Sequence, residues 1–311
     1  MQFKRIKRPV DGVLLLDKPA GLSSNQALQQ VKRLYQAEKA GHTGSLDPFA
    51  TGLLPVCFGE ATKFSHFLLD ADKTYHATLR LGATSTTGDT EGEITELPDR
   101  PVTQAAFEHA LTGFQGVIRQ VPPMYSALKY QGKALYEYAR AGQEIERTAR
   151  EVTVYRIELM EFGRGTAKIF VSCSKGTYIR TLAEDIGKRL GGGAYLTALR
   201  RVGTGGFELE SALTIPQIEA IAPEQRDAVL LETDLLLRHL PGIDLDQDGA
   251  RHLRLGQAVR VSGHSATGLL RLYDDRKNFL GLGLRDADGR IAPKRLLKAA
   301  TCESPMPEKS E

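Results

Sequence analysis

The chain has 311 residues, of which 41% are apolar and 25% charged, and its formal net charge is +3. This length predicts two domains, or one large domain with an appendage, and the composition is that of an average globular protein. These values exclude a globally basic protein, and no apolar run approaches the roughly 18 residues that a membrane span requires.

The N-terminal part reads as a strand followed by a helix. Residues 12–16 form a short apolar run that predicts a buried strand, and the Asp17–Gly21 segment breaks it. Ser23 or Ser24 can cap a helix that we expect to run to about Lys39, because apolar residues recur on one face of it. Gly41 stands where a glycine would end that helix.

The segment from Gly41 to Gly52 places one carboxylate, Asp47, in a glycine-bracketed loop directly before Pro48. Asp before Pro is typical of an ordinary helix start, here limited to about one turn, and local chemistry favours that interpretation. The alternative is a short acidic side chain held at the mouth of a site.

Alternation of apolar and polar residues predicts a half-buried strand over residues 73–81, followed by a polar loop over 84–92. Residues 103–113 and 178–190 read as helices, residues 152–158 and 167–173 as strands, and residues 214–216 as the start of another helix. The stretch 121–150 is rich in Tyr, Gln, Lys and Arg, and is either an exposed insertion or a hairpin plus a short helix.

The character of the chain changes near Pro241. Short apolar runs over 258–261, 268–273 and 279–284 alternate with Gly and Asp turns, which predicts a small β-rich domain. Residues 244–300 hold 11 Lys or Arg against 7 Asp or Glu. This excess of basic residues is either a face that attracts the phosphate backbone of a nucleic acid or part of an ordinary mixed-charge surface. We expect the tail from Thr301 to be disordered.

Arg180 lies in the first turn of the helix expected over 178–190, where a cation opposes the helix macrodipole. Two partners would offset that cost. One is Glu184, four residues along the same helix, and the other is a distant carboxylate that the guanidinium holds in a bidentate manner.

Other candidate residues also have two interpretations. Tyr75 is either a core aromatic or a stacking platform for an unpaired base. His42 is either a solvated loop residue or a side chain that inserts into a nucleic-acid loop. Lys18 belongs to a turn and is by default an exposed surface charge. A glycosidase-like pair would require a second acid, for which Asp89 or Asp185 can be proposed.

Several common signatures are missing from the sequence. It contains no Walker A loop, no dinucleotide fingerprint and no nucleophile elbow. The three cysteines, Cys57, Cys173 and Cys302, are isolated, so neither a disulfide framework nor a metal site is indicated. The basic N-terminus lacks the apolar core of a signal peptide, and we expect a cytoplasmic protein. The candidate chemistry is cofactor-free and centred on one carboxylate.

Four blocks of sequence resemble the TruB family of tRNA pseudouridine synthases. They are GVLLLDKP at 12–19, the 41–52 loop with its continuation GEATK at 59–63, KTY at 73–75 and GTYIR at 176–180. PPMYSALK at 122–129 is a fifth, supporting block. The blocks occur in family order over most of residues 10–205, and the loop around Asp47 is the most specific of them.

The resemblance implies roles for particular residues. Asp47 matches the family's catalytic aspartate, Arg180 its ion-pair partner, and Tyr75 the tyrosine that stacks on the flipped uracil. The resemblance further implies substrate contacts for His42, Tyr178, Leu199, Asp89 and Lys18. Phe49 occupies a position that is often smaller.

The implied fold is α+β, with a mixed, largely antiparallel sheet and flanking helices over residues 1–240. An RNA-closing insertion is expected at about 124–150, and a PUA-like RNA-binding domain at 241–300. The implied reaction isomerises uridine 55 in the T loop of tRNA without a cofactor or a metal, and no protein partner is implied. The alternatives are a guide-RNA-dependent subunit and an RNA chaperone without chemistry.

Overall fold

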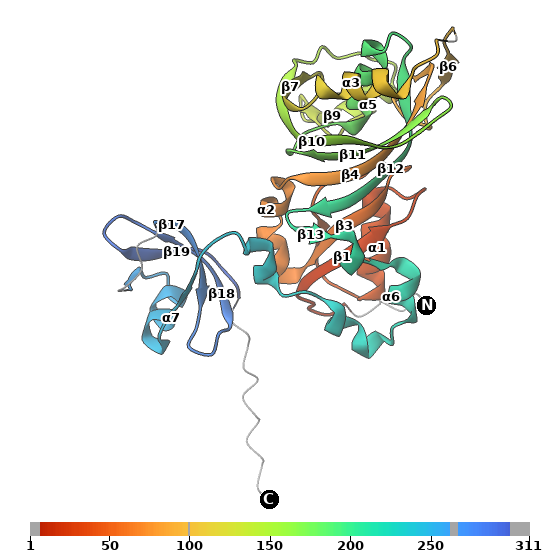
Figure 1. The fold of residues 1–311 in the computed structure, drawn as a ribbon. Coiled ribbons are helices and arrows are strands. Elements are labelled where there is room, and N and C mark those ends of the chain that lie inside the picture. The colour runs from red at the N-terminus through yellow and green to blue at the C-terminus, as the bar shows by residue number, and fades with distance from the viewer. Residues whose placement is uncertain (1–6, 99, 262–266, 299–311) are drawn as a thin grey trace, which may run out of the picture.

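The computed structural model describes residues 7–98, 100–261 and 267–298. Its main body is built on a ten-stranded sheet in the order β14-β1-β3-β12-β4-β11-β10-β7, with β2 paired to β3 and β13 to β12 (Figure 1). The strands are β1 Gly12–Lys18, β2 Ala40–His42, β3 Thr51–Phe58, β4 Lys73–Leu81, β7 Gly116–Gln120, β10 Arg150–Gly163, β11 Thr166–Cys173, β12 Ala194–Thr204, β13 Phe207–Glu208 and β14 Leu213–Thr214. The β1–β14 and β3–β12 pairs are parallel and the others antiparallel, which confirms the expected mixed sheet.

Helices pack on this sheet and fill its curved faces (Figure 1). The α-helices of the main body are α1 Ser24–Leu34, α2 His66–Leu69, α3 Gln104–Thr112, α5 Ile179–Arg189 and α6 Ile215–Ala220. Four 3-10 helices are η1 Gly59–Phe64, η2 Leu209–Ser211, η3 Pro223–Val229 and η4 Thr233–Leu237. The predicted helices at 103–113, 178–190 and after Thr214 are therefore confirmed.

Helix α1 begins as predicted but ends earlier. Ser23 and Gln26 form a capping box at its start. The helix stops at Leu34, and Gln36 takes a positive φ of 51° directly after the C-cap. The prediction that it continues to Lys39 and ends at Gly41 was wrong, because Gly41 lies in strand β2 and pairs with Cys57.

Strand β4 lies at the centre of the sheet between β12 and β11. Its residues alternate between buried and half-buried along the whole strand, as the sequence predicted. Tyr75 belongs to the buried set. The position of β4 therefore directs Tyr75 into the interior rather than toward solvent.

The segment over 121–150 is a hairpin plus a short helix, the second of the two interpretations. Strands β8 Lys129–Tyr130 and β9 Lys133–Ala134 precede helix α4 Leu135–Arg140. Gln131 and Gly132 both have positive φ, as a tight two-residue hairpin turn requires. A second small hairpin joins β5 Ala83–Ser85 to β6 Ile94–Glu96, and its two strands flank most of the polar loop predicted over 84–92.

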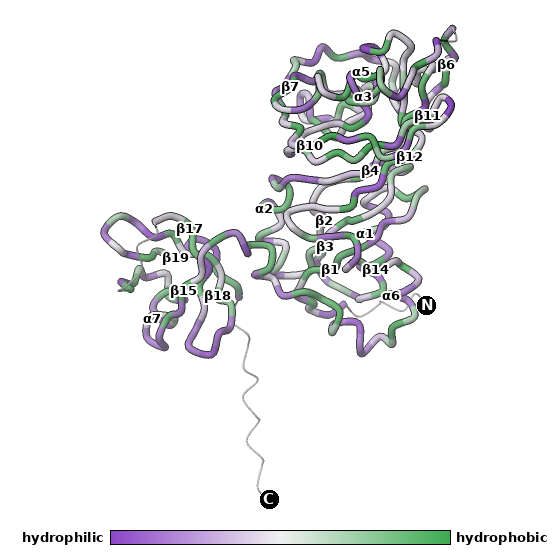
Figure 2. Tube along the Cα trace, viewed as in Figure 1, coloured by the Kyte–Doolittle hydropathy of each residue, from purple (hydrophilic) through white to green (hydrophobic). Residues whose placement is uncertain are grey.

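The C-terminal domain contains a five-stranded sheet in the order β15-β17-β18-β19-β16. Its strands are β15 Gly242–Asp244, β16 Val259–Arg260, β17 Gly268–Tyr273, β18 Phe279–Arg285 and β19 Arg290–Leu296. Helix α7 Gln247–Arg254, which the sequence did not predict, packs on it and is largely hydrophilic (Figure 2). The tail from Thr301, with Cys302, lies outside the described residues.

The two domains share a hydrophobic cluster that joins η1, η4 and strand β18. The rings of Phe64 and Phe279 lie 5.7 Å apart in this cluster. Lys63 donates to the Leu296 carbonyl across the junction, at 2.9 Å. The C-terminal domain is thus packed against the main body and is continuous with its core. No helix among the described residues is long and apolar enough to cross a membrane.

Candidate active site

A cavity of about 1170 Å³ opens in the main body, and several segments far apart in the sequence line it, among them residues 23–26 at the start of helix α1. These segments contribute Asp47 and His42, Tyr75, Asp89 and Glu91, Tyr125 with Ser126, Tyr178 with Arg180, and Leu199. Tyr136 and Arg140 of helix α4 also line it, so the hairpin-and-helix insertion forms one wall. The cavity therefore collects all but one of the residues to which the resemblance assigned a role at the site.

The exception is Lys18, which does not line the cavity. The side chain is fully buried, so its interpretation as an exposed surface charge was wrong. Lys18 Nζ donates to the carbonyls of Pro19, Leu22 and Pro48 at 2.8, 2.6 and 3.3 Å. Burial lowers the pKa of Lys18 to about 8. Its contacts tie the end of β1 to the loop that carries Asp47.

Asp47 lies in an irregular loop and not at a helix start, so the interpretation from local chemistry was wrong. The residues that follow it enter strand β3 at Thr51, and they do so because the Gly52 backbone pairs closely with Arg201 on β12. The loop is fixed from the other side by Ser24. The Leu46 N–H donates to Ser24 Oγ at 2.7 Å, and that hydroxyl donates back to the Leu46 carbonyl at 3.0 Å.

Arg180 joins three segments of the site at the start of α5. Its Nε lies 3.0 Å from Asp47 Oδ2 and 3.6 Å from Asp89 Oδ2. Its two terminal nitrogens donate to the Thr87 carbonyl at 2.9 Å and to the Tyr125 carbonyl at 2.7 Å. Only 5% of the side chain is exposed, and these partners compensate the buried charge.

The distant-carboxylate interpretation of Arg180 is therefore confirmed, but the expected bidentate contact was wrong, because only Nε faces Asp47 and the two terminal nitrogens donate to backbone carbonyls. Within the described residues, Glu184 forms no ion pair with Arg180, so the alternative of a local pair on the same helix was wrong. Burial raises the pKa of Glu184, and the charges of Lys188 and Arg180 oppose that rise only in part.

The ionisation of Asp47 is set by two opposing effects. Burial raises the pKa of Asp47 above its ordinary value, and the Arg180 guanidinium opposes that rise. The neighbouring Asp89 carboxylate raises it further. Because 37% of the Asp47 side chain remains exposed, the carboxylate is accessible from the cavity.

Asp89 is the buried acid of the pair, with 2% of its side chain exposed. Its Oδ1 accepts from Thr87 Oγ1 at 2.5 Å and from the Glu91 N–H at 3.0 Å. Asp185, the other proposed second acid, pairs with Lys188 on α5 and is absent from the cavity lining. The two acids at the site therefore share one guanidinium.

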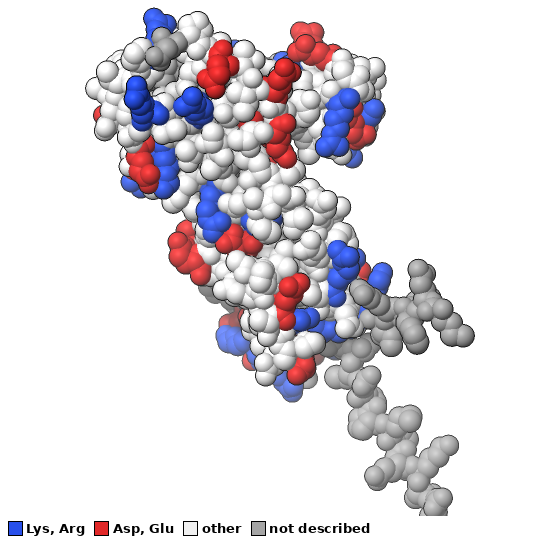
Figure 3. Space-filling view, turned by 90° about the vertical axis from the view of Figure 1, so that its right-hand side faces the viewer, with Lys and Arg blue, Asp and Glu red and all other residues white. Residues whose placement is uncertain are grey.

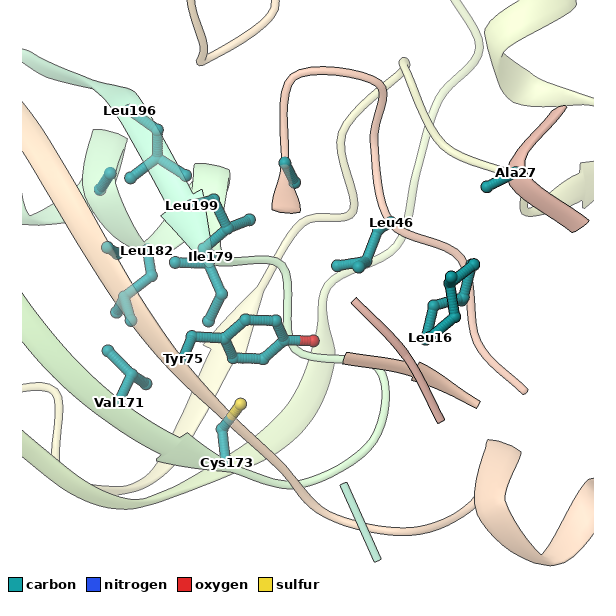
Figure 4. Close-up of a cluster of buried hydrophobic side chains, with 14 of the residues drawn as sticks. Leu16, Ala27, Leu46, Tyr75, Val171, Cys173, Ile179, Leu182, Leu196 and Leu199 are labelled. Carbon is teal, nitrogen blue, oxygen red and sulfur yellow. The ribbon is translucent and has the colours of Figure 1, made fainter. Parts of the chain in front are cut away.

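Tyr75 is a core aromatic, which confirms its first interpretation, and it also lines the cavity. Its ring is 8% exposed and packs in the core near Leu199, Ile179 and Cys173, as Figure 4 shows. Its hydroxyl points toward the side on which Leu46 of the Asp47 loop lies (Figure 4). The residue also lines the cavity, so it presents an aromatic surface there. Burial raises the pKa of Tyr75.

Three further candidates line the same cavity. Tyr178 caps α5, and Gln120 accepts from its N–H at 3.1 Å and donates to its carbonyl at 3.3 Å. Leu199 projects from β12. His42 lies in strand β2 and is half-buried, with an Nδ1 atom that has no hydrogen-bond partner in the described structure. The interpretation of His42 as a solvated loop residue was wrong.

Sequence reasoning missed strands β3 and β12, and with them Arg201. Arg201 is 1% exposed and donates to backbone carbonyls of Leu53 and Gly44 behind the cavity. Glu91 and Ser126, which line the cavity, were missed as well. Residues 194–204 show no regular alternation of apolar and polar types, so no local signal identified β12.

The described residues contain no group of His, Cys, Asp and Glu side chains able to hold a metal ion. Cys57 and Cys173 are buried free thiols, and burial raises the pKa of each to about 12. On the face in Figure 3, basic and acidic side chains are interspersed between large uncharged areas.

Comparison with known proteins matches three consecutive parts of the chain to one family. Residues 32–179 match the N-terminal domain of the TruB family pseudouridylate synthases. Residues 180–240 match the C-terminal domain of tRNA pseudouridylate synthase B, and residues 241–297 match the C-terminal part of pseudouridine synthase II TruB.

Individual relatives agree over nearly the full length. The chain is 60% identical to the tRNA pseudouridine synthase B of Methylobacillus flagellatus, over 96% of this chain and 99% of that protein. It is 52% identical to the tRNA pseudouridine synthase B of Pseudomonas aeruginosa, over 96% and 99% of the two chains.

A solved structure shares the fold. A Cbf5-Nop10-Gar1 complex contains a chain that is 27% identical, with a TM-score of 0.68 over 88% of this chain and 78% of that one. This likeness agrees with the mixed sheet, the flanking helices and the β-rich C-terminal domain described above. Together with the full-length relatives, it shows that the chain belongs to the TruB family of pseudouridine synthases.

Proposed function

We propose that the chain isomerises uridine 55 in the T loop of tRNA to pseudouridine, without a cofactor. The observation that carries this proposal is the Asp47–Arg180 ion pair at 3.0 Å, placed in a cavity whose aromatic surface is Tyr75. A partly exposed carboxylate held by a buried guanidinium suits chemistry at a sugar carbon. The full-length identity to tRNA pseudouridine synthases supports the same substrate.

The reaction breaks the bond between the ribose and N1 of uracil, turns the base, and forms a bond to its C5. Two routes are open to Asp47, attack on C1′ of the ribose and assistance to an elimination there. Both require the ionised carboxylate, which Arg180 favours. The target must leave the base stack, which costs a few kcal/mol, and stacking on Tyr75 offsets part of this cost.

The remaining cavity residues are assigned to substrate contacts. Tyr178 and Leu199 bound the space around the extruded uracil, and Asp89 lies beside Arg180 near the nucleotide. His42 has an unpartnered ring nitrogen that suits insertion into the RNA loop. Lys18 acts on the substrate indirectly, because its contact with the Pro48 carbonyl holds the Asp47 loop.

The insertion over 124–150 is assigned to closure over the RNA, and the domain over 241–300 to RNA binding. The wall that Tyr136 and Arg140 contribute to the cavity supports the first assignment. The tRNA substrate also implies a cytoplasmic location.

Incubation of the purified chain with unmodified tRNA, in the absence of any guide RNA, tests this function. Position-resolved mass spectrometry of the product is expected to find pseudouridine at position 55 and not at the neighbouring uridines. Modification that requires an added guide RNA would favour a guided subunit, and binding without any modification would favour an RNA chaperone.

A further inference from the structure

Arg201 occupies a central position behind the cavity, and the chemistry described so far gives it no role. On strand β12 it pairs with Gly52 of β3 on one side and with Tyr75 of β4 on the other. The approach to β3 is so close that a Cβ at Gly52 would lie 2.2 Å from the Arg201 carbonyl oxygen. The Arg201 backbone is therefore fixed between the strand that follows the Asp47 loop and the strand that carries Tyr75.

The guanidinium of Arg201 is held by main-chain groups of the Asp47 loop and its continuation. Nε donates to the Leu53 carbonyl at 2.6 Å, and a terminal nitrogen donates to the Gly44 carbonyl at 3.1 Å. No carboxylate among the described residues forms an ion pair with it, in contrast to Arg180. A cation that is 1% exposed and lacks an anionic partner exerts an unusually strong field on its neighbours.

Tyr75 is the neighbour that this charge faces. Residues directly opposite on an antiparallel pair project from the same face of the sheet, so the two side chains lie together. Three titratable groups act on the Tyr75 hydroxyl from the elements packed around it: Arg201 from β12, Cys173 from β11 and Asp47 from its loop. Of these, Cys173 and Asp47 raise the pKa of Tyr75, and only Arg201 lowers it.

We propose that Arg201 is a positioning residue that acts through Tyr75, holding its hydroxyl in register with the Asp47 loop and stabilising the phenolate that accepts the C5 proton. This inference rests on the proposed function. When the C5–C1′ bond has formed, C5 carries both the ribose and its original proton. The phenolate takes that proton, the C5–H electron pair returns to the ring, and N1 gains a proton from solvent. Tyr75 then releases its proton to solvent.

The test compares Arg201→Gln with the unaltered chain in single-turnover formation of pseudouridine, from about pH 6 to pH 10. Substrate tRNA carries either hydrogen or deuterium at C5 of its uridines. Loss of a close cation shifts a pKa by about one unit or more. Where removal of the C5 proton limits the rate, a one-unit rise in the pKa of Tyr75 lowers the phenolate fraction, and with it the rate of the variant, about tenfold. The loss is expected to shrink at alkaline pH, where more phenolate is present and an earlier step limits the rate. The variant is also expected to show a primary isotope effect at neutral pH that fades as the pH rises.

Arg226→Gln is the matched control. Arg226 is also buried and donates only to backbone carbonyls, those of Ile218, Ile221, Leu34 and Glu219, but it lies outside the cavity lining. A purely structural loss is expected in this variant, with a lower unfolding temperature and an unchanged pH profile. In Tyr75→Phe, adding Arg201→Gln is expected to cause no further loss in rate.

A loss in Arg201→Gln that is the same at every pH, without an isotope effect, would overturn the proposal. If Arg201→Gln does not fold, a fluorinated tyrosine at position 75 tests the same point, because its lower phenol pKa is expected to move the rate profile toward lower pH. An unmoved profile would count against the phenolate. Absence of pseudouridine from the unaltered chain would instead contradict the proposed function.

Discussion

At the scale of single residues, the orientation of the site's ion pair follows from the burial of its arginine. Arg180 is almost completely buried, yet it contacts Asp47, Asp89 and two backbone carbonyls, so its orientation is determined by four partners. A buried cation with this many fixed partners has little freedom to reorient. The partly exposed Asp47 carboxylate is therefore the mobile member of the pair and the one that can approach a substrate.

Arg180→Lys is expected to lose most of the activity while tRNA binding persists. A lysine keeps the charge but cannot reach Asp47, Thr87 and Tyr125 together, because an ammonium lacks the planar fork. Single-turnover rates and filter-binding affinities measure the two effects separately. Near-normal turnover would mean that only a positive charge is required at this position.

The pH dependence follows from the raised pKa of Asp47. The reactive form is the carboxylate, so activity is present above that pKa and is lost as pH falls through it. The loss is expected at a higher pH than for an ordinary aspartate. In Arg180→Gln, whose guanidinium no longer opposes the rise, the acid limb of residual activity moves to still higher pH. A limb that stays in place or moves down would contradict this assignment.

At the scale of elements, helix α1 is the support of the catalytic loop. Ser24 exchanges two hydrogen bonds with the Leu46 backbone, next to Asp47, and is itself buried. The adjacent Ser23, which also lines the cavity, caps the same helix through Gln26 and forms no hydrogen bond with the loop among the described residues. Variants of the two serines therefore distinguish an effect on the stability of helix α1 from an effect on the geometry of the Asp47 loop.

Ser24→Ala is expected to lower the catalytic rate more than Ser23→Ala does. The first variant leaves the buried Leu46 N–H unpaired, which costs about 1–3 kcal/mol and loosens the loop. The second loses a helix cap, which costs about 1 kcal/mol of stability. Thermal unfolding and single-turnover rates of both variants give the comparison. Equal rates in the two variants would show that the anchor is dispensable.

The sequence predicted correctly those helices and strands in which apolar residues recur at regular spacing. Strand β4 and helix α5 were correct because their buried faces repeat regularly. Strand β3 was missed because it is buried along nearly its whole length and contains Gly52 and Pro55, which favour a turn when read locally. The helix start expected at Asp47 failed for the same reason, since long-range pairing with β12 overrides local preference.

Whether the sequence alone identified the role of a site residue depended on whether its partner lay nearby in the chain. Asp47 and Arg180 are 3.0 Å apart in space and far apart in the chain, so their pairing required the resemblance or the fold. Lys18 and Arg201 are buried cations bound to backbone carbonyls, and no local pattern distinguishes such residues from surface charges. Arg201 is identified only by the pairing of β12 with its neighbouring strands in the folded sheet.

At the scale of the whole molecule, the C-terminal domain shares a hydrophobic cluster with the main body. Phe279 and Leu282 of β18 belong to the same cluster as Phe64 of η1 and Leu236 of η4. Removing the domain would expose this apolar surface as well as remove its basic residues. If the domain has its proposed RNA-binding role, its removal is expected to change RNA affinity and stability together.

Truncation after Leu240 is expected to lower the unfolding temperature and to weaken tRNA affinity, with a smaller effect on the single-turnover rate at saturating enzyme. The first effect follows from the exposed cluster, and the second from the lost basic surface. Calorimetry, binding titrations and rapid-quench kinetics measure the three quantities. An affinity unchanged by the truncation would contradict an RNA-binding role for the domain.

The most direct test of the central claim uses Asp47→Asn and Asp185→Asn on the same unmodified tRNA. Asp185 is an acid on α5 outside the cavity lining, so its amide variant controls for the loss of a charge. Mass spectrometry is expected to find pseudouridine at position 55 with Asp185→Asn and none with Asp47→Asn, while both bind tRNA within about tenfold of the unaltered chain. Substantial pseudouridine from Asp47→Asn would contradict the claim that this carboxylate carries the chemistry.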